Sequence, residues 1–150
     1  MWQEKLTEIK EEEKIFGAEL NEAASDEDIE KFKKKVKEKL NVELPLEYIR
    51  FLQVINGLEF NGYTIYGIDQ ELVEKKPKNK IDGFIDSNQV WHEVEHQRKY
   101  LFFGDDSISW YVFDKEKKQY KLLDKPSGDE LEDFNGFNEM IERIMSDALQ

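Results

Sequence analysis

Residues 91–96 contain the pattern H-E-x-x-H, whose residue types and spacing are typical of a catalytic zinc site. In zinc hydrolases with this pattern, two histidines one helical turn apart bind the metal, and the glutamate between them polarises the attacking water. The corresponding residues are His92, Glu93 and His96. A catalytic zinc needs three protein ligands and the chain has 2 histidines, so the third ligand would have to be a carboxylate.

The residues that surround this pattern favour a different interpretation. Glu95 occupies one variable position, and Gln97, Arg98 and Lys99 follow directly, so we expect a charged surface helix rather than a buried one. Three hypotheses stay open: a catalytic zinc, incidental metal binding by the histidine pair, and a solvated helix face. We favour the last, and we expect neither a resident metal nor another cofactor.

Two other carboxylate pairs could in principle act as catalytic groups. Asp105 and Asp106 are expected in a tight hairpin turn, where aspartate is favoured for its turn-forming side chain, and Asp69 and Glu71 follow a strand into a loop. Neither pair is accompanied by a base, a nucleophile or a metal cluster, and the chain has no G-x-S-x-G or phosphate-binding glycine loop. The sequence therefore predicts a protein that is not an enzyme.

Composition limits the class of protein. A length of 150 residues suits a single domain, 1–150, that can bury a core without disulfide or metal support. There is no cysteine, no apolar run as long as a membrane span, and Met1 leads into a charged segment rather than a signal sequence. We expect a soluble, cytosolic protein.

The net charge of -12 is concentrated at the two ends of the chain. Residues 1–30 carry 11 acids and 3 bases, and residues 124–150 carry 8 acids and 2 bases. Such a field repels nucleic acid and anionic lipid and attracts a basic protein, although acidity that serves only solubility stays an alternative.

Three helices are predicted to open the chain. The first covers residues 2–16 and ends at Gly17, the second begins behind Ser25, with Asp28 completing a capping box, and the third begins at Pro45 and ends at Gly57. Their apolar residues recur at helical spacing: Trp2, Leu6, Ile9 and Phe16; Ile29, Phe32, Val36 and Leu40; Tyr48, Phe51, Leu52 and Ile55.

Extended structure is predicted for the middle of the chain. Residues 63–68 indicate a strand and 71–80 an exposed loop, and a helix capped by Asp86 or Ser87 follows, with inward Val90, Trp91 and Val94. Residues 100–124 read as an antiparallel meander, whose middle strand has Ile108, Trp110 and Val112 on one face and Ser109, Tyr111 and Phe113 on the other.

The chain is predicted to close with a polar linker, 124–133, and a final helix with the buried stripe Phe134, Phe137, Ile141, Ile144 and Met145. Helices first, a central antiparallel sheet and a closing helix predict the α+β class.

The segment 44–69 resembles the signature of the SUKH superfamily, which joins bacterial immunity proteins with fungal cell-wall-synthesis regulators. The matching positions are Leu44, Pro45, Tyr48, Phe51, Leu52, Asn56, Gly57, Gly62 and Gly67. The family's later hairpin pattern matches Gly104, Asp105, Tyr111, Phe113 and Asp114, without the glycine that usually follows the turn. Each of these residues also has a purely structural explanation, so the motif identifies a fold rather than an active site.

The resemblance implies a non-catalytic binding domain that neutralises a cognate toxin, such as a nuclease with a basic groove. A regulatory module of the same fold with a cellular protein partner is the alternative, and a zinc hydrolase is the remote one. We expect the contact with a basic partner to involve Asp105, Asp106, Asp129, Glu130, Glu132 and Asp133. The next candidate is the first helix, with Glu11, Glu12 and Glu13.

Overall fold

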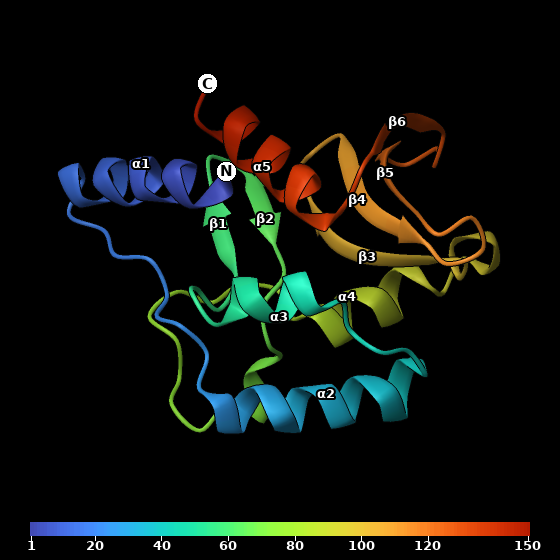
Figure 1. Cartoon of the computed structure of the whole chain (residues 1–150), viewed down its shortest axis with the longest axis horizontal. Helices are drawn as coiled ribbons and strands as arrows, with labels where there is room; N and C mark the ends of the chain where they lie inside the picture. The colour runs from blue at the N-terminus through green and yellow to red at the C-terminus, as the bar shows by residue number, and fades with distance from the viewer.

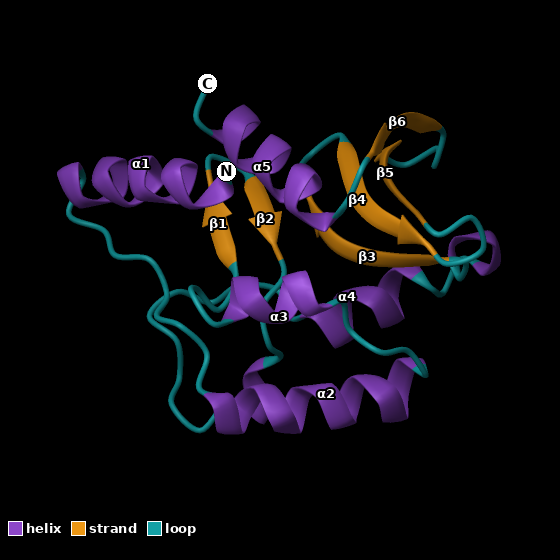
Figure 2. Cartoon of the chain, in the orientation of Figure 1, coloured by secondary structure: helices purple, strands orange, loops and turns teal.

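The computed structural model describes residues 1–150 as five α-helices and a six-stranded sheet (Figure 1). Every strand pairs antiparallel with its neighbour in the sequence, so the sheet order is β1-β2-β3-β4-β5-β6. The predicted α+β class, with helices first, a central antiparallel sheet and a closing helix, is confirmed (Figure 2). None of the helices combines the length and the apolar content that crossing a membrane requires.

The first two helices follow their predicted apolar stripes. Helix α1 (Trp2–Ile15) buries Trp2, Leu6 and Ile9, and α2 (Asp26–Leu40) buries Ile29, Phe32 and Val36. The predicted Ser25 cap of α2 is confirmed, since Ser25 Oγ accepts the Asp28 N–H at 3.1 Å, but the Asp28 carboxylate does not form the second hydrogen bond of a capping box. The inward position predicted for Phe16 is wrong: α1 ends one residue earlier, and this side chain is 84% exposed.

Helix α3 (Leu46–Leu52) begins directly after Pro45 and is held by Tyr48, whose hydroxyl donates to the Tyr66 carbonyl at 2.7 Å. It ends earlier than predicted, so Gly57 is not the residue just past its C-terminus. Gly57 has the expected left-handed conformation, φ +82°, but a Cβ there would lie 3.0 Å from the Gly67 Cα. The two motif glycines are therefore needed because two backbone segments meet closely.

Helix α4 (Phe84–Trp91) begins before the predicted caps, since Gly83 precedes its first turn. Its buried residues are Phe84, Ile85 and Asn88. Of the residues predicted to face inward, Trp91 packs against the core, whereas Val90 and Val94 are exposed, so that prediction is wrong for the two valines. The Asn88 amide donates to the Phe102 carbonyl at 2.9 Å and accepts the Phe102 N–H at 2.7 Å. The Asn88 side chain thus satisfies the backbone carbonyl and N–H of Phe102 in β3, in place of a neighbouring strand.

The sheet consists of β1 (Leu58–Phe60), β2 (Tyr63–Ile65), β3 (Tyr100–Asp105), β4 (Ser109–Asp114), β5 (Gln119–Asp124) and β6 (Glu130–Phe134). The meander predicted for 100–124 is confirmed, although Ile108 is exposed rather than packed with Trp110 and Val112. Sequence patterns missed β1, and they placed in a linker the residues that form the edge strand β6. Phe134 ends β6 and does not join the last helix.

Helix α5 (Phe137–Ala148) lies beside α1 and packs on the sheet (Figure 1). Its predicted residues Phe137, Ile141, Ile144 and Met145 are all buried. Phe103 lies at the centre of the core, with its ring centroid 5.1 Å from Tyr48, 5.3 Å from Phe84 and 5.3 Å from Phe137. Side chains from α3, α4, the sheet and α5 therefore meet in one cluster of 34 buried residues.

Candidate partner-binding surface

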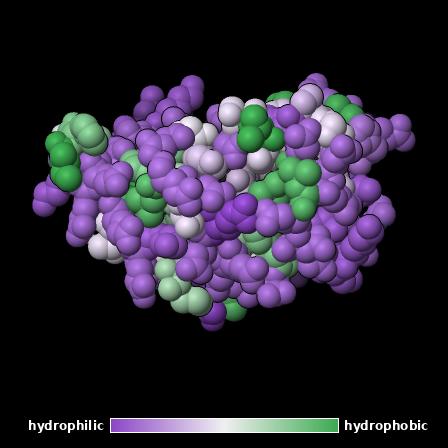
Figure 3. All heavy atoms as spheres, turned by 90° about the horizontal axis from the view of Figure 1, so that it is seen from above, coloured by the Kyte–Doolittle hydropathy of each residue, from purple (hydrophilic) through white to green (hydrophobic).

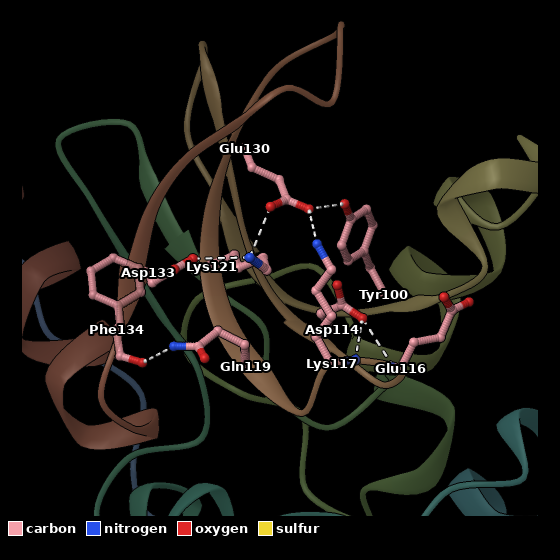
Figure 4. Close-up of polar contacts among 9 residues, drawn as sticks. All are labelled: Tyr100, Asp114, Glu116, Lys117, Gln119, Lys121, Glu130, Asp133 and Phe134. Carbon is pink, nitrogen blue, oxygen red and sulfur yellow. Dashed lines mark hydrogen bonds and ion pairs between the residues drawn. The ribbon is translucent and has the colours of Figure 1, made fainter.

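The acidic edge strand β6 is tied to the sheet through Lys121 on β5 (Figure 4). Lys121 Nζ donates to Glu130 Oε2 at 2.8 Å and to Asp133 Oδ1 at 2.9 Å, and only 5% of the lysine side chain is exposed. The hydrogen bond with Glu130 raises the pKa of Lys121, and the same bond lowers the pKa of Glu130. Because a buried ammonium needs anionic partners, these two carboxylates primarily stabilise the fold.

Glu132 is also paired within the chain. Arg143 on α5 contacts Glu132 Oε2 through its Nη1 at 2.9 Å, and its Nε donates to Asp147 Oδ2 at 2.9 Å. Of the four acids predicted on this segment, Asp129 alone forms no ion pair. The negative charge of residues 129–133 is therefore largely neutralised by neighbouring cations.

The hairpin turn carries Asp105 and Asp106, and both carboxylates bond within the protein. Asp106 is 7% exposed, and its carboxylate accepts the Ile108 N–H at 2.8 Å and the Tyr111 hydroxyl at 2.9 Å. Asp105 accepts the Tyr66 hydroxyl at 2.7 Å, and burial raises its pKa. Asp105 keeps 16% of its side chain exposed and lies 3.8 Å from Lys125 Nζ, whereas Asp106 is buried. Both carboxylates are therefore less accessible to a partner than their place beside a turn suggests.

The H-E-x-x-H segment does not form a continuous helix. Helix α4 ends at Trp91, Val94 is extended, and a short 3₁₀ turn covers Glu95–Gln97. His92 Nε2 lies 2.7 Å from the Tyr100 carbonyl oxygen, and partial burial lowers the pKa of this imidazole, whereas His96 is exposed. The expected surface helix is wrong here, and the two histidines lack the one-turn relationship that the zinc hypothesis requires.

Three carboxylates meet at the start of α4, where the sequence had indicated only Asp69 and Glu71. Oxygen atoms of Asp69, Glu71 and Asp86 all lie within 4.8 Å of one another. Asp69 is buried, which raises its pKa to about 6, and it accepts the N–H groups of Ile85 at 2.9 Å and Asp86 at 2.8 Å. It therefore caps α4 from a distant loop, which leaves the exposed Glu71 and Asp86 as the outer members of the group.

Helix α1 presents carboxylates that remain free of internal partners. The ion pair that it makes joins the N-terminal amine to Glu4 at 3.7 Å, while Glu8, Glu11 and Glu12 are exposed and unpaired. At its end, Ile15 and Phe16 are 79% and 84% exposed. Figure 3 shows hydrophobic spheres at the left end of the molecule, where α1 ends in Figure 1. Periodicity assigned Phe16 to the core, and thus missed this surface.

The SUKH_6 family model, described as SMI1-KNR4 cell-wall, matches residues 26–122, which is well over half of the chain. The matched segment runs from α2 into β5 and contains the whole motif from Leu44 to Gly67; α1, β6 and α5 lie outside it. A search of curated proteins finds no match.

Proposed function

The chain belongs to the SUKH superfamily, and from that membership we propose that it is an immunity protein that binds and neutralises a cognate toxin domain. Members of this family act in general as non-catalytic immunity or regulatory modules that bind protein partners. The family match is the observation that carries the proposal. A non-enzymatic role in this chain accords with a motif whose residues pack the fold rather than line a reactive centre.

The charge of the chain supports a basic toxin as the partner. The net charge is -12, and α1 carries glutamates without internal ion pairs. A nuclease presents a basic groove to its phosphate substrate, so an acidic inhibitor is steered toward that groove and competes with the nucleic acid. The absence of cysteine suits action in the reducing cytoplasm, where such a toxin would meet nucleic acid.

The side-chain geometry shifts the proposed contact from the segment first expected. Glu130, Glu132 and Asp133 have intramolecular cations beside them, and Asp105 and Asp106 are engaged by tyrosine hydroxyls. A paired carboxylate attracts a distant cation less than a free one does. We therefore assign the electrostatic attraction mainly to α1, with Asp129 as the free acid of the original set.

A regulatory module with a cellular partner is the second candidate, favoured by the description of the matching family as SMI1-KNR4 cell-wall. An immunity protein and a regulatory module would both bind a protein, and the identity of that protein distinguishes them. A housekeeping protein that co-purifies with this chain at stoichiometric yield would favour the regulatory role.

Co-expression tests the immunity role. The product of the adjacent gene is expressed in a heterologous host, alone and together with this chain. The proposal predicts that the neighbour alone stops growth and that co-expression restores it. Unchanged growth arrest despite soluble expression of both proteins would contradict the immunity role.

A further inference from the structure

Helix α1 ends in two adjacent large apolar side chains that contact solvent. Ile15 and Phe16 are 79% and 84% exposed, the highest values among the exposed large hydrophobic residues of the chain. Elsewhere α1 is a conventional amphipathic helix, with Trp2, Leu6 and Ile9 buried. Single exposed apolar residues are normal on protein surfaces, whereas adjacent large ones that serve no internal packing are a candidate interaction site.

The surrounding backbone gives this pair no packing role. Gly17 follows with φ +76°, and a Cβ added there would meet no atom within 4 Å, so the chain turns away in open space. Neither Ile15 nor Phe16 belongs to the core cluster. The fold therefore positions the pair without using it.

Helical spacing places unpaired carboxylates beside the apolar pair. Glu8 and Glu11 precede Ile15 by seven and four residues, so the three side chains share one solvent-facing side of α1. Glu12 precedes Phe16 by four residues and lies over the same turn. An acidic stripe thus leads to an apolar end.

We propose that Ile15 and Phe16 are the anchor of the partner contact and insert into an apolar pocket that is rimmed by basic residues on the partner protein. The proposal rests on the proposed function and names the surface that performs it. Protein interfaces concentrate binding energy in a few aromatic and aliphatic anchors surrounded by a charged rim. The glutamates of α1 steer the basic partner, and the apolar pair determines how slowly it leaves.

The charges favour this occupant over a second copy of the chain or a membrane. A two-fold contact through the end of α1 would set the same glutamates against each other, in a protein of net charge -12. Anionic lipid would be repelled for the same reason. A basic protein is the occupant that the unpaired carboxylates attract.

The position of α1 relative to the family match gives independent support. The match covers residues 26–122, so α1 lies outside the segment that this chain shares with its family model. Proteins that use one fold for different partners need contacts that differ between them, and elements outside the shared segment can supply these contacts.

Binding measurements on single variants test the anchor. The probe is the purified, catalytically inactivated product of the adjacent gene, titrated with wild type, Phe16→Ala and Ile108→Ala. Ile108 is a matched control, since it is 68% exposed on the β3–β4 hairpin. We expect Phe16→Ala to weaken binding by roughly 30-fold or more, mainly through faster dissociation, and Ile108→Ala to change it by less than about 3-fold.

A charge-matched pair of triple variants tests the stripe. Glu8, Glu11 and Glu12 are changed to Gln in one variant, and the exposed Glu93, Glu95 and Glu116 in the other, so that both lose the same net charge. The first variant should associate more slowly at low salt than the second, and the difference should disappear at high salt. Equal association rates would contradict the role of α1 in steering.

The outcomes separate the anchor from the immunity role. If the neighbour binds wild type and Phe16→Ala equally well, the anchor is overturned and the proposed function stands. If wild type does not bind the neighbour at all, both are overturned. Wild-type dimerisation that Phe16→Ala abolishes would assign the pair to a second copy and overturn the basic-partner contact.

Discussion

Lys121 on β5 and Asp133 on β6 form an ion pair of 2.9 Å in which the lysine side chain is 5% exposed and the aspartate side chain 59% exposed. This difference in exposure indicates that Asp133 serves Lys121: the buried ammonium needs a counter-charge, whereas the exposed carboxylate does not. Surface acidity on this edge of the sheet is therefore largely a structural requirement of β5.

Removing the partners of Lys121 should destabilise the fold. We expect Glu130→Gln combined with Asp133→Asn to lower the free energy of unfolding by about 1–3 kcal/mol, because the lysine loses both anionic partners. Lys121→Met should be less damaging, since it removes the buried charge itself. Urea unfolding of the double variant and of Lys121→Met measures these effects. Glu132→Gln is a surface control, whose free energy of unfolding should fall by under about 1 kcal/mol. A double variant as stable as this control would contradict the assigned role.

Two glycines with nearly the same backbone angle should respond differently to alanine. Gly57 has φ +82°, and a Cβ on it would lie 3.0 Å from the Gly67 Cα, whereas Gly62 has φ +83° and nothing within 4 Å of that position. Gly62→Ala should lower the free energy of unfolding by about 1–2 kcal/mol, because alanine is strained in the left-handed conformation. Gly57→Ala should lower the free energy of unfolding by clearly more, because the backbone segments at Gly57 and Gly67 must also move apart to admit the methyl group. Equal losses in chemical denaturation would show that the motif glycine is needed for its angle only.

Asp69 should make stability depend on pH in the direction opposite to a paired carboxylate. Burial raises its pKa from 3.8 to about 6, so between about pH 4 and pH 6 the folded state holds a proton that the unfolded chain releases. Its contribution to the free energy of unfolding is fully present below about pH 4 and is lost as pH rises through 6, by roughly 3 kcal/mol.

The variant Asp69→Asn isolates this effect. Thermal or urea unfolding of wild type and Asp69→Asn at several pH values between 4 and 7 should give a stability difference that favours wild type increasingly as pH falls. Asp129→Asn, at an exposed position, is the control. A difference that stays constant over this range would contradict the raised pKa.

The two histidines should behave as unrelated side chains. His92 contacts the Phe102 ring at a centroid distance of 6.0 Å and the Tyr100 carbonyl oxygen at 2.7 Å, so His92→Ala should lower stability by about 1 kcal/mol. His96→Ala should leave it unchanged, because His96 is exposed. Metal analysis after dialysis should find far less than one zinc per chain. Stoichiometric zinc that is lost in either variant would restore the metal hypothesis.

Sequence patterns succeeded where the determining contacts are local. The stripes of α1 and α2 and the Ser25 cap depend on residues three and four positions apart, and the structure has them as predicted, with Phe16 as the exception. The motif around Tyr48 also predicted the fold, although the close approach of Gly57 and Gly67 was not visible in the sequence.

The errors concern elements that distant residues determine. The segment 129–133 has the composition of a loop, and it becomes a strand because β5 supplies backbone partners and Lys121 supplies a counter-charge. The start of α4 was misplaced because its cap, Asp69, comes from another loop. Local capping residues such as Asp86 could not reveal this.

The candidate contact surface required the same non-local information. Counting acids found charge at both ends of the chain, and only the ion pairs distinguish the neutralised carboxylates of β6 from the free ones of α1. Exposure of Phe16 could not be read from periodicity either, since its place at the helix end removes it from the core.

The central claim is that this chain neutralises a basic toxin domain by binding it, and inhibition in vitro tests that claim most directly. The activity of the purified adjacent gene product is measured as this chain is added from sub-stoichiometric amounts to excess. We expect a linear loss of activity that reaches completion at one chain per toxin domain. Full activity in the presence of excess folded chain would contradict it.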